Sequence, residues 1–205
     1  MITVVDYGMG NLRSVAKAFE AVGASVKVSS KPEDIKNSKA IVVPGVGAFG
    51  DAIKHLKELN LYDEIINHIN NKKPYFGICL GLQILFEKGY EFGEHKGLGI
   101  IKGEVIRFEQ KKGYKIPHMG WNQVFIKQKD GMFTGIKNGE FFYFVHSFYV
   151  VPEDSRVIAS TTDYINEFCS SIQVENIWAV QFHPEKSQKA GLKLIKNFVE
   201  KVKGF

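Results

Sequence analysis

Short apolar runs that alternate with amphipathic helical patterns constrain the fold of this chain more than any other feature. The apolar runs in its first half lie at residues 1–6, 25–29, 40–43 and 75–78. Helical patterns lie beside them at residues 11–22, 31–34, 51–59 and 61–70. This alternation favours right-handed crossovers and a mostly parallel central sheet flanked by helices. The sequence therefore predicts the α/β class.

The second half of the chain has a different pattern. After Gly97, short β patterns follow one another at residues 100–101, 105–108, 124–126, 141–151 and 157–160. They predict a smaller antiparallel β extension together with later strands of the main sheet. Residues 141–145 are apolar on both sides, which favours an interior strand. A final helix is expected from Ser187 onward, and one domain is expected over residues 1–205.

The segment GICLG at residues 77–81 places Cys79 between an apolar run and a helical pattern at residues 80–87. Glycines two before and two after the cysteine remove side chains that would clash where a strand reverses sharply into a helix. This is the geometry of a nucleophile elbow with a thiol in place of the hydroxyl. A helix that begins at Leu80 would direct free N–H groups and a positive dipole end at the sulfur. Without a base nearby, however, such a cysteine is a small buried hydrophobe.

The segment WAVQFHPE at residues 178–185 supplies a candidate base. Its alternation predicts a strand, in which residues i and i+2 project to the same side. Glu185 would then hold the ring of His183, while the other ring nitrogen faces the thiol of Cys79. These three residues form a candidate Cys-His-Glu triad. His146 has no acidic neighbour in the sequence, so we expect it to be structural.

A second glycine segment, GVGAFG at residues 45–50, matches the dinucleotide-binding pattern G-x-G-x-x-G. Dinucleotide binders place that pattern after the first strand, and the next strand ends in an acidic residue. Here the pattern follows a later strand, and the next one ends in Cys79. Two interpretations remain open: a plain glycine turn, or a loop that directs a backbone N–H at an oxyanion.

Composition and motif spacing argue against several other classes of protein. The formal charge is +5, but the lysines are scattered and the aromatic residues lie in apolar runs, which disfavours a nucleic-acid groove. No apolar run has the length of a membrane span, and two cysteines are too few for a disulfide framework, so a cytoplasmic location is expected. Cys169 lacks elbow glycines and is expected in the core. No Cys/His spacing indicates a metal site, and no cofactor is expected.

Together, the GICLG elbow and the FHPE segment at residues 182–185 resemble the triad (class I) glutamine amidotransferases. Further segments are similar to the family of glutaminase subunits of imidazole glycerol phosphate synthase, in histidine biosynthesis. They are DYGMGNLRSV at 6–15, PGVGAF at 44–49, PHMGWN at 117–122, FVHS at 144–147 and FHPEKS at 182–187.

The resemblance implies hydrolysis of L-glutamine to glutamate and ammonia by Cys79, His183 and Glu185. It also implies an oxyanion hole and a glutamine-binding site, for which the matching positions are Val46, Gly47, Leu80, Gln83, Ser147 and Phe148. Within the oxyanion hole, the N–H groups of Val46 and Leu80 would be the donors. The backbone at residues 147–148 would recognise the amino-acid end of glutamine.

The implied partner is a (β/α)₈ cyclase subunit in a heterodimer, which uses the ammonia to make imidazole glycerol phosphate and aminoimidazole carboxamide ribonucleotide. Positions that match the docking face of the family are Asn11, Trp121, Tyr143 and Lys186. The segment at residues 115–122 is expected to be a loop. Three alternatives stay open: a paralogous glutaminase that serves another synthase, such as one amidating a nucleotide-linked sugar, a regulatory module, and a hydrolase or peptidase of the same broad type.

Overall fold

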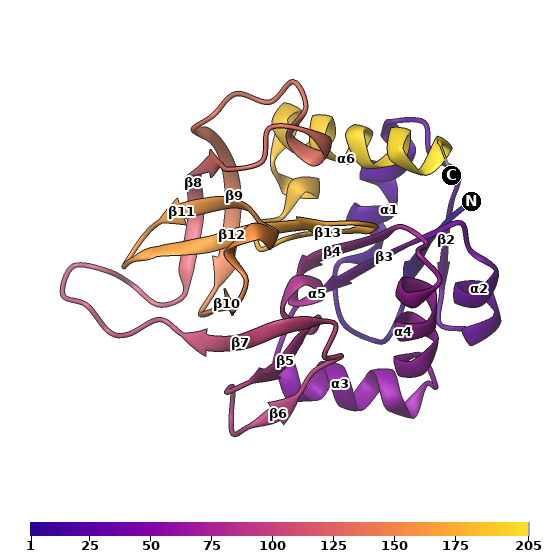
Figure 1. The fold of residues 1–205 in the computed structure, drawn as a ribbon, viewed down its shortest axis with the longest axis horizontal. Helices are drawn as coiled ribbons and strands as arrows, with labels where there is room; N and C mark the ends of the chain where they lie inside the picture. The colour runs from indigo at the N-terminus through magenta and orange to yellow at the C-terminus, as the bar shows by residue number, and fades with distance from the viewer. Residues whose placement is uncertain (205) are drawn as a thin grey trace.

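In the computed structural model, which describes residues 1–204, one mixed sheet runs through the molecule (Figure 1). Its first part has the strand order β2-β1-β3-β4-β13, and all neighbours in it are parallel. The bounds of these strands are Ile2–Val5 (β1), Val26–Ser29 (β2), Ala40–Gly45 (β3), Tyr75–Cys79 (β4) and Ile177–Val180 (β13). The predicted parallel α/β sheet is therefore confirmed.

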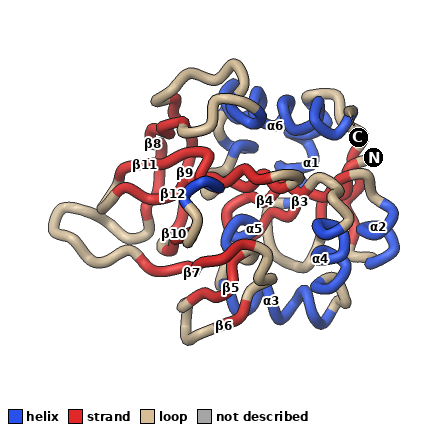
Figure 2. The backbone as a smooth tube through the Cα atoms, viewed as in Figure 1, coloured by secondary structure: helices blue, strands red, loops and turns tan. Residues whose placement is uncertain are grey.

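Helices cover both faces of these parallel strands (Figure 2). One face carries α1 (Leu12–Ala21) and α6 (Gln188–Lys203), which contact each other. The other face carries α2 (Pro32–Asn37), α3 (Phe49–Glu58) and α4 (Tyr62–Asn70). Within residues 1–204, no helix has the length and hydropathy that a membrane span requires.

The continuous apolar runs follow from this double cover, because a strand buried on both faces has no polar side. Val42 and Phe76 pack into the core beneath α1 and α6, whereas Val43 and Tyr75 pack into the core beneath α3 and α4. Asn11 caps α1, since its side chain accepts from the backbone N–H of Ser14 at 3.3 Å.

The other half of the sheet consists of strands and loops, with helix confined to short turns (Figure 2). Beyond β13 the strand order continues β12-β10-β7-β5-β6, while β11, β8 and β9 branch from β12. The bounds are Phe86–Gly89 (β5), His95–Lys96 (β6), Ile101–Arg107 (β7), His118–Ile126 (β8), Glu140–His146 (β9), Phe148–Pro152 (β10), Ile158–Asp163 (β11) and Glu167–Val174 (β12). The short turns are Gly131–Phe133 (η1), Ser155–Val157 (η2) and Pro184–Lys186 (η3). Most of these pairs are antiparallel, which confirms the predicted extension.

Two predictions for this half are wrong. The segment at residues 141–145 belongs to β9, which pairs only with β8 in the described part of the chain and so forms an edge. Its side chains alternate: Phe142 and Phe144 are buried, whereas Phe141 is 48% exposed. Because the exposed face of β9 is also aromatic, the sequence pattern did not show that this strand is buried on one face only. The segment at residues 115–122 is a loop only up to Pro117, because β8 begins at His118.

The helix predicted at residues 80–87 is also wrong beyond its first turn. The structure has a one-turn helix, α5 (Leu80–Gln83), and the chain then continues into β5. The carbonyls of Ile84 and Leu85 accept hydrogen bonds from a later segment, from the N–H groups of Leu98 at 2.8 Å and Ile101 at 3.0 Å. Apolar residues at helical spacing were thus buried on every side by tertiary contacts and did not continue the helix.

We predict that Gly81→Ala lowers the free energy of unfolding by about 1–3 kcal/mol, as overpacking of a closed core does. A Cβ at Gly81 would lie 1.8 Å from the carbonyl oxygen of Val43, which is backbone of β3 and has no freedom to move aside. Urea-induced unfolding measures this change. In the control Gly204→Ala, the new Cβ would lie 3.5 Å from the nearest atom, Lys201 O, at a φ of −78°. Equal stability of Gly81→Ala and wild type would contradict the close approach of α5 to β3.

Candidate active site

Cys79 lies at the carboxyl end of β4, where the chain turns sharply into α5. Its backbone has φ 54° and ψ −104°, a strained conformation for a residue other than glycine. The two flanking glycines permit this turn, because a Cβ at Gly77 would lie 2.5 Å from the carbonyl oxygen of Gly81. The strain and the glycines together give the geometry of a nucleophile elbow.

The sulfur of Cys79 is almost buried, with 7% of the residue exposed. The side-chain amide of Gln181 donates to it at 3.6 Å, and the carbonyl oxygen of Val145 lies 3.9 Å away. Because α5 has only one turn, it supplies little of the macrodipole that a longer helix would provide. What it retains is the N–H groups of its first residues, which have no acceptor within the helix.

His183 and Glu185 form a buried pair. The distance from Nδ1 of His183 to Oε1 of Glu185 is 2.8 Å, and the side chains are 4% and 2% exposed. The prediction that one strand carries both residues is wrong, because β13 ends at Val180 and Glu185 lies in the 3₁₀ turn η3. Pro184 has no N–H to donate, which suits it to the first position of this turn.

The electrostatics of this pair favour a charged imidazole. Burial by itself would lower the pKa of His183, but the neighbouring Cys79 thiolate and the Glu185 carboxylate raise this pKa to about 10. Because Glu185 holds Nδ1, the nitrogen that remains for Cys79 is Nε2, which has no other hydrogen-bond partner within residues 1–204. The arrangement is suited to a thiolate–imidazolium pair.

A cavity of about 410 Å³ opens beside Cys79. It is lined by Val46, Gly47, Ala48, Cys79, Leu80, Gln83, Glu91, Phe92, Pro117, Val145, His146, Ser147 and Phe148. All six positions expected for the oxyanion hole and for glutamine binding are among them. The loop after β3 that contributes Val46 has Gly47 at φ +106°, a conformation that favours glycine.

Sequence reasoning missed two polar residues at this site. Glu91 lies on the cavity wall, and its Oε2 accepts from the backbone N–H of Phe49 at 3.0 Å. No pattern around it signals a site. Gln181 contacts the sulfur of Cys79 and lies two residues before His183. The same-side rule for strands that was applied to His183 would also have indicated Gln181.

The two histidines on β8 and β9 form a buried network, and one of them, His146, also lines the cavity. His118 Nδ1 lies 2.9 Å from His146 Nε2, and His146 Nδ1 lies 2.8 Å from the carbonyl oxygen of Phe148. Burial lowers the pKa of His118 to about 4 and that of His146 to about 3. Both rings are therefore neutral, and His146 has the hydrogen bonds of a structural residue.

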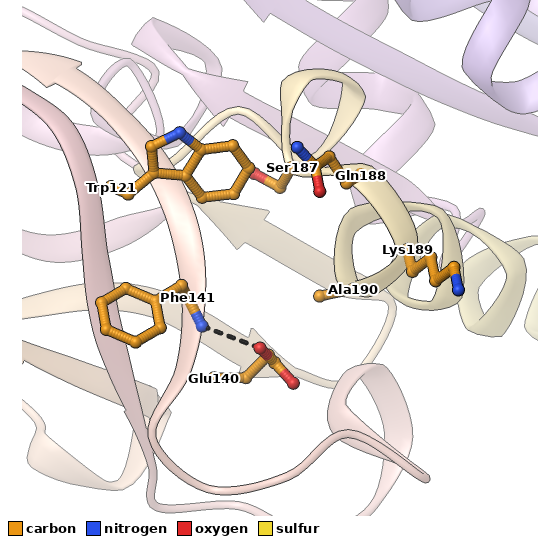
Figure 3. Close-up of a pocket in the computed structure, with 7 residues that line it drawn as sticks. All are labelled: Trp121, Glu140, Phe141, Ser187, Gln188, Lys189 and Ala190. Atoms are coloured by element: carbon orange, nitrogen blue, oxygen red, sulfur yellow. Dashed lines mark hydrogen bonds between the residues drawn. The ribbon is translucent and has the colours of Figure 1, made fainter.

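Three of the four expected docking residues lie together on the outside of the molecule. The rings of Trp121 and Tyr143 are 6.1 Å apart, and Lys186 Nζ lies 5.8 Å from the centre of the Tyr143 ring. Asn11 caps α1, and α1 contacts η3, the turn that carries Lys186. Trp121 and Phe141 line an open hollow of about 540 Å³, which is bounded on its other side by the first residues of α6. Figure 3 shows the residues around this hollow.

We predict that Glu185→Gln lowers the pKa of His183. The hydrogen bond and the negative charge of Glu185 both favour the imidazolium, so their loss disfavours it. An NMR titration of the His183 ring measures the shift. The same replacement at an exposed carboxylate, Glu175→Gln, is the control and leaves the titration unchanged. An unchanged midpoint in Glu185→Gln would show that Glu185 does not act on the ring.

Comparison with known proteins assigns the chain to a family. A model of the class I glutamine amidotransferases matches residues 3–202. The imidazole glycerol phosphate synthase subunit HisH of Aquifex aeolicus is 58% identical, over 97% of this chain and 95% of its own length. The protein of the same name from Syntrophotalea carbinolica is 50% identical, over 97% and 98%.

Solved structures support the same fold at low identity. PurLQS from Thermotoga maritima superposes with a TM-score of 0.74 at 20% identity, over 99% of this chain and 97% of its own. The glutaminase domain of CTPS from Trypanosoma brucei gives 0.66 at 18%, over 97% and 93%. The match over residues 3–202 and the identity to full-length relatives decide the family. The chain belongs to the class I glutamine amidotransferases, within the family of HisH subunits of imidazole glycerol phosphate synthase.

Proposed function

We propose that the chain hydrolyses L-glutamine at Cys79 and passes the ammonia to a (β/α)₈ cyclase subunit of imidazole glycerol phosphate synthase. The observation that carries this proposal is the convergence of two independent features on one place. A strained elbow presents Cys79 at a cavity, and a buried His183–Glu185 pair has its free ring nitrogen available to the same thiol. Together with the family, these features favour an acting glutaminase over a regulatory module that has kept only the fold.

In the proposed mechanism, the Cys79 thiolate attacks the side-chain carboxamide carbon of glutamine and forms a tetrahedral oxyanion. The N–H groups of Val46 and Leu80 would stabilise that oxyanion. Collapse of the intermediate breaks the C–N bond, and His183 gives its Nε2 proton to the leaving nitrogen, which departs as ammonia. His183 then takes a proton from water, which hydrolyses the glutamyl thioester to glutamate and restores the thiolate–imidazolium pair. Glu185 stays ionised and orients the ring.

The cavity wall offers complementary groups for the rest of the amino acid. Glu91 is the acidic side chain on the wall and is suited to the α-ammonium group of glutamine. The chain at Ser147 and Phe148, between β9 and β10, supplies backbone polar groups for the amino-acid end. Gln83 completes the wall one helical turn after Cys79.

A partner protein is implied by the family, because its members are named as subunits of a synthase. Ammonia is mostly protonated at neutral pH, so a glutaminase is useful only if the ammonia reaches its acceptor first. The outer face of β8 and β9 presents Met119 and Trp121, which are 62% and 46% exposed, next to Phe141. Exposed apolar groups in one patch favour a protein interface, and we propose that the cyclase docks here, near Tyr143 and Lys186.

The acceptor of the ammonia is either the cyclase of histidine biosynthesis or another synthase. The alternative is a paralogue that serves another reaction, such as amidation of a nucleotide-linked sugar. Relatives from Aquifex aeolicus and Syntrophotalea carbinolica, which are 58% and 50% identical, both carry the name of the histidine-pathway subunit. This similarity supports the cyclase of histidine biosynthesis.

We predict that glutamate release rises strongly only when the cyclase and its nucleotide ligand are both present, and that Cys79→Ala abolishes it. The reason is that alanine leaves no atom to form the thioester. Enzymatic assay of glutamate measures the effect. Cys169→Ala is the matched control, because that thiol is buried in the core away from the cavity and its loss leaves the activity in place. Release above background by Cys79→Ala would refute the mechanism, and release indifferent to this cyclase would favour the paralogue.

We also predict that Trp121→Ala weakens binding of the cyclase by about 2 kcal/mol, the effect expected of a tryptophan at the centre of an interface. Calorimetric titration of the two proteins measures the change. Val28→Ala removes an equally exposed apolar side chain on β2, at the opposite edge of the sheet, and is expected to bind normally. Equal affinities of the two variants would show that the β8–β9 face is not the docking surface.

A further inference from the structure

Gln181 is a fully buried amide, 0% exposed, that lies between the nucleophile and the substrate wall. Its Nε2 donates to the sulfur of Cys79 at 3.6 Å, and its Oε1 accepts from Nε2 of Gln83 at 3.1 Å. Nε2 of Gln83 also donates to the carbonyl oxygen of Phe148 at 3.1 Å. The two amides therefore connect a backbone carbonyl at the cavity wall to the reactive sulfur.

The orientation of each amide follows from the end of this chain of hydrogen bonds. A backbone carbonyl only accepts, so the atom of Gln83 that faces Phe148 must be the amide nitrogen. That nitrogen also faces Gln181, which must present its oxygen there. The remaining NH₂ group of Gln181 is then directed at Cys79. Neither amide is able to flip without setting two donors or two acceptors against each other.

A fixed donor at the sulfur acts differently on the two forms of Cys79. The thiol has a proton that is able to point to the carbonyl oxygen of Val145, 3.9 Å away, and its sulfur is a weak acceptor. The thiolate has no proton to donate and accepts a charge-assisted hydrogen bond, which is the stronger kind. An N–H held against the sulfur therefore favours the thiolate.

We propose that Gln181 is a positioning residue that keeps the sulfur of Cys79 in its nucleophilic form and locates it relative to the substrate wall. The inference rests on the proposed role of Cys79 as the nucleophile. Gln181 would add to the Cys-His-Glu triad a neutral hydrogen-bond donor, two residues before His183 in the sequence. A buried amide that served only for packing would gain nothing from its sulfur contact, since an apolar side chain of the same size would fill the space without the cost of desolvation.

The test compares Gln181→Met and Gln181→Glu in the full chain. Methionine has nearly the same length and offers no N–H, whereas glutamate keeps the acceptor for Gln83 and places oxygen against the sulfur. Iodoacetamide alkylation of Cys79, followed by mass spectrometry of its peptide as a function of pH, reports the thiolate directly. Cys169 does not interfere, because burial raises the pKa of that thiol to about 12. Gln173→Met, in a part of β12 that makes no contact with the cavity, controls for loss of a glutamine.

We expect the midpoint of alkylation to rise by about one pH unit or more in Gln181→Met, and further in Gln181→Glu, with no change in Gln173→Met. The kcat of the cyclase complex should fall about tenfold or more, while KM changes less than about twofold. Unchanged midpoints in folded Gln181 variants would overturn the inference, and Gln181→Glu carries the test if Gln181→Met does not fold. Separately, if alkylation of wild-type Cys79 left glutamine hydrolysis intact, the proposed function itself would fail.

Discussion

The close approach of α5 to β3 and β4 is the contact on which the rest of the site depends. It exists because Gly77 and Gly81 have no side chains, so the carbonyl of one turn lies against the backbone of the neighbouring strand. This contact forces Cys79 into its strained conformation at the end of β4. The sheet is buried on both faces, and the hydrophobic cores on its two faces pack around the elbow. This packing sustains the backbone strain at Cys79.

The parallel half of the fold could be predicted from the sequence because its signals are local. Strands such as β3 are apolar throughout, and the cap of α1 at Asn11 is a short-range hydrogen bond. The failures occurred where tertiary contacts replaced local ones. Ile84 and Leu85 have the pattern of a helix but give their carbonyls to a later segment. The edge strand β9 has the pattern of an interior strand, because an exposed aromatic face and a buried one have the same composition.

The candidate site residues, too, could be predicted from the sequence only where their signals are local. Cys79 was recognisable because the elbow needs glycines at fixed positions, and these are visible in the sequence. His183 was found only in combination with that elbow, and the strand argument reached the right pair through the wrong local structure. Gln181 acts through Gln83 and Cys79, which are 98 and 102 residues away along the chain, and Glu91 has no local signature at all. Such contacts depend on the complete sheet, and the one local signal was the position of Gln181 two residues before His183.

The buried, neutral pair of histidines makes the folded protein less stable at acidic pH. His118 and His146 have pKa values of about 4 and about 3, below the ordinary value of 6.5, because the fold buries them uncharged. Unfolded chains bind these two protons more tightly, so the stability that depends on the neutral pair is full above about pH 6.5 and declines as the pH falls towards those values. Both rings lie in β8 and β9, the strands whose outer face carries Trp121. Acidification would therefore weaken the packing of β8 and β9 at this edge of the sheet.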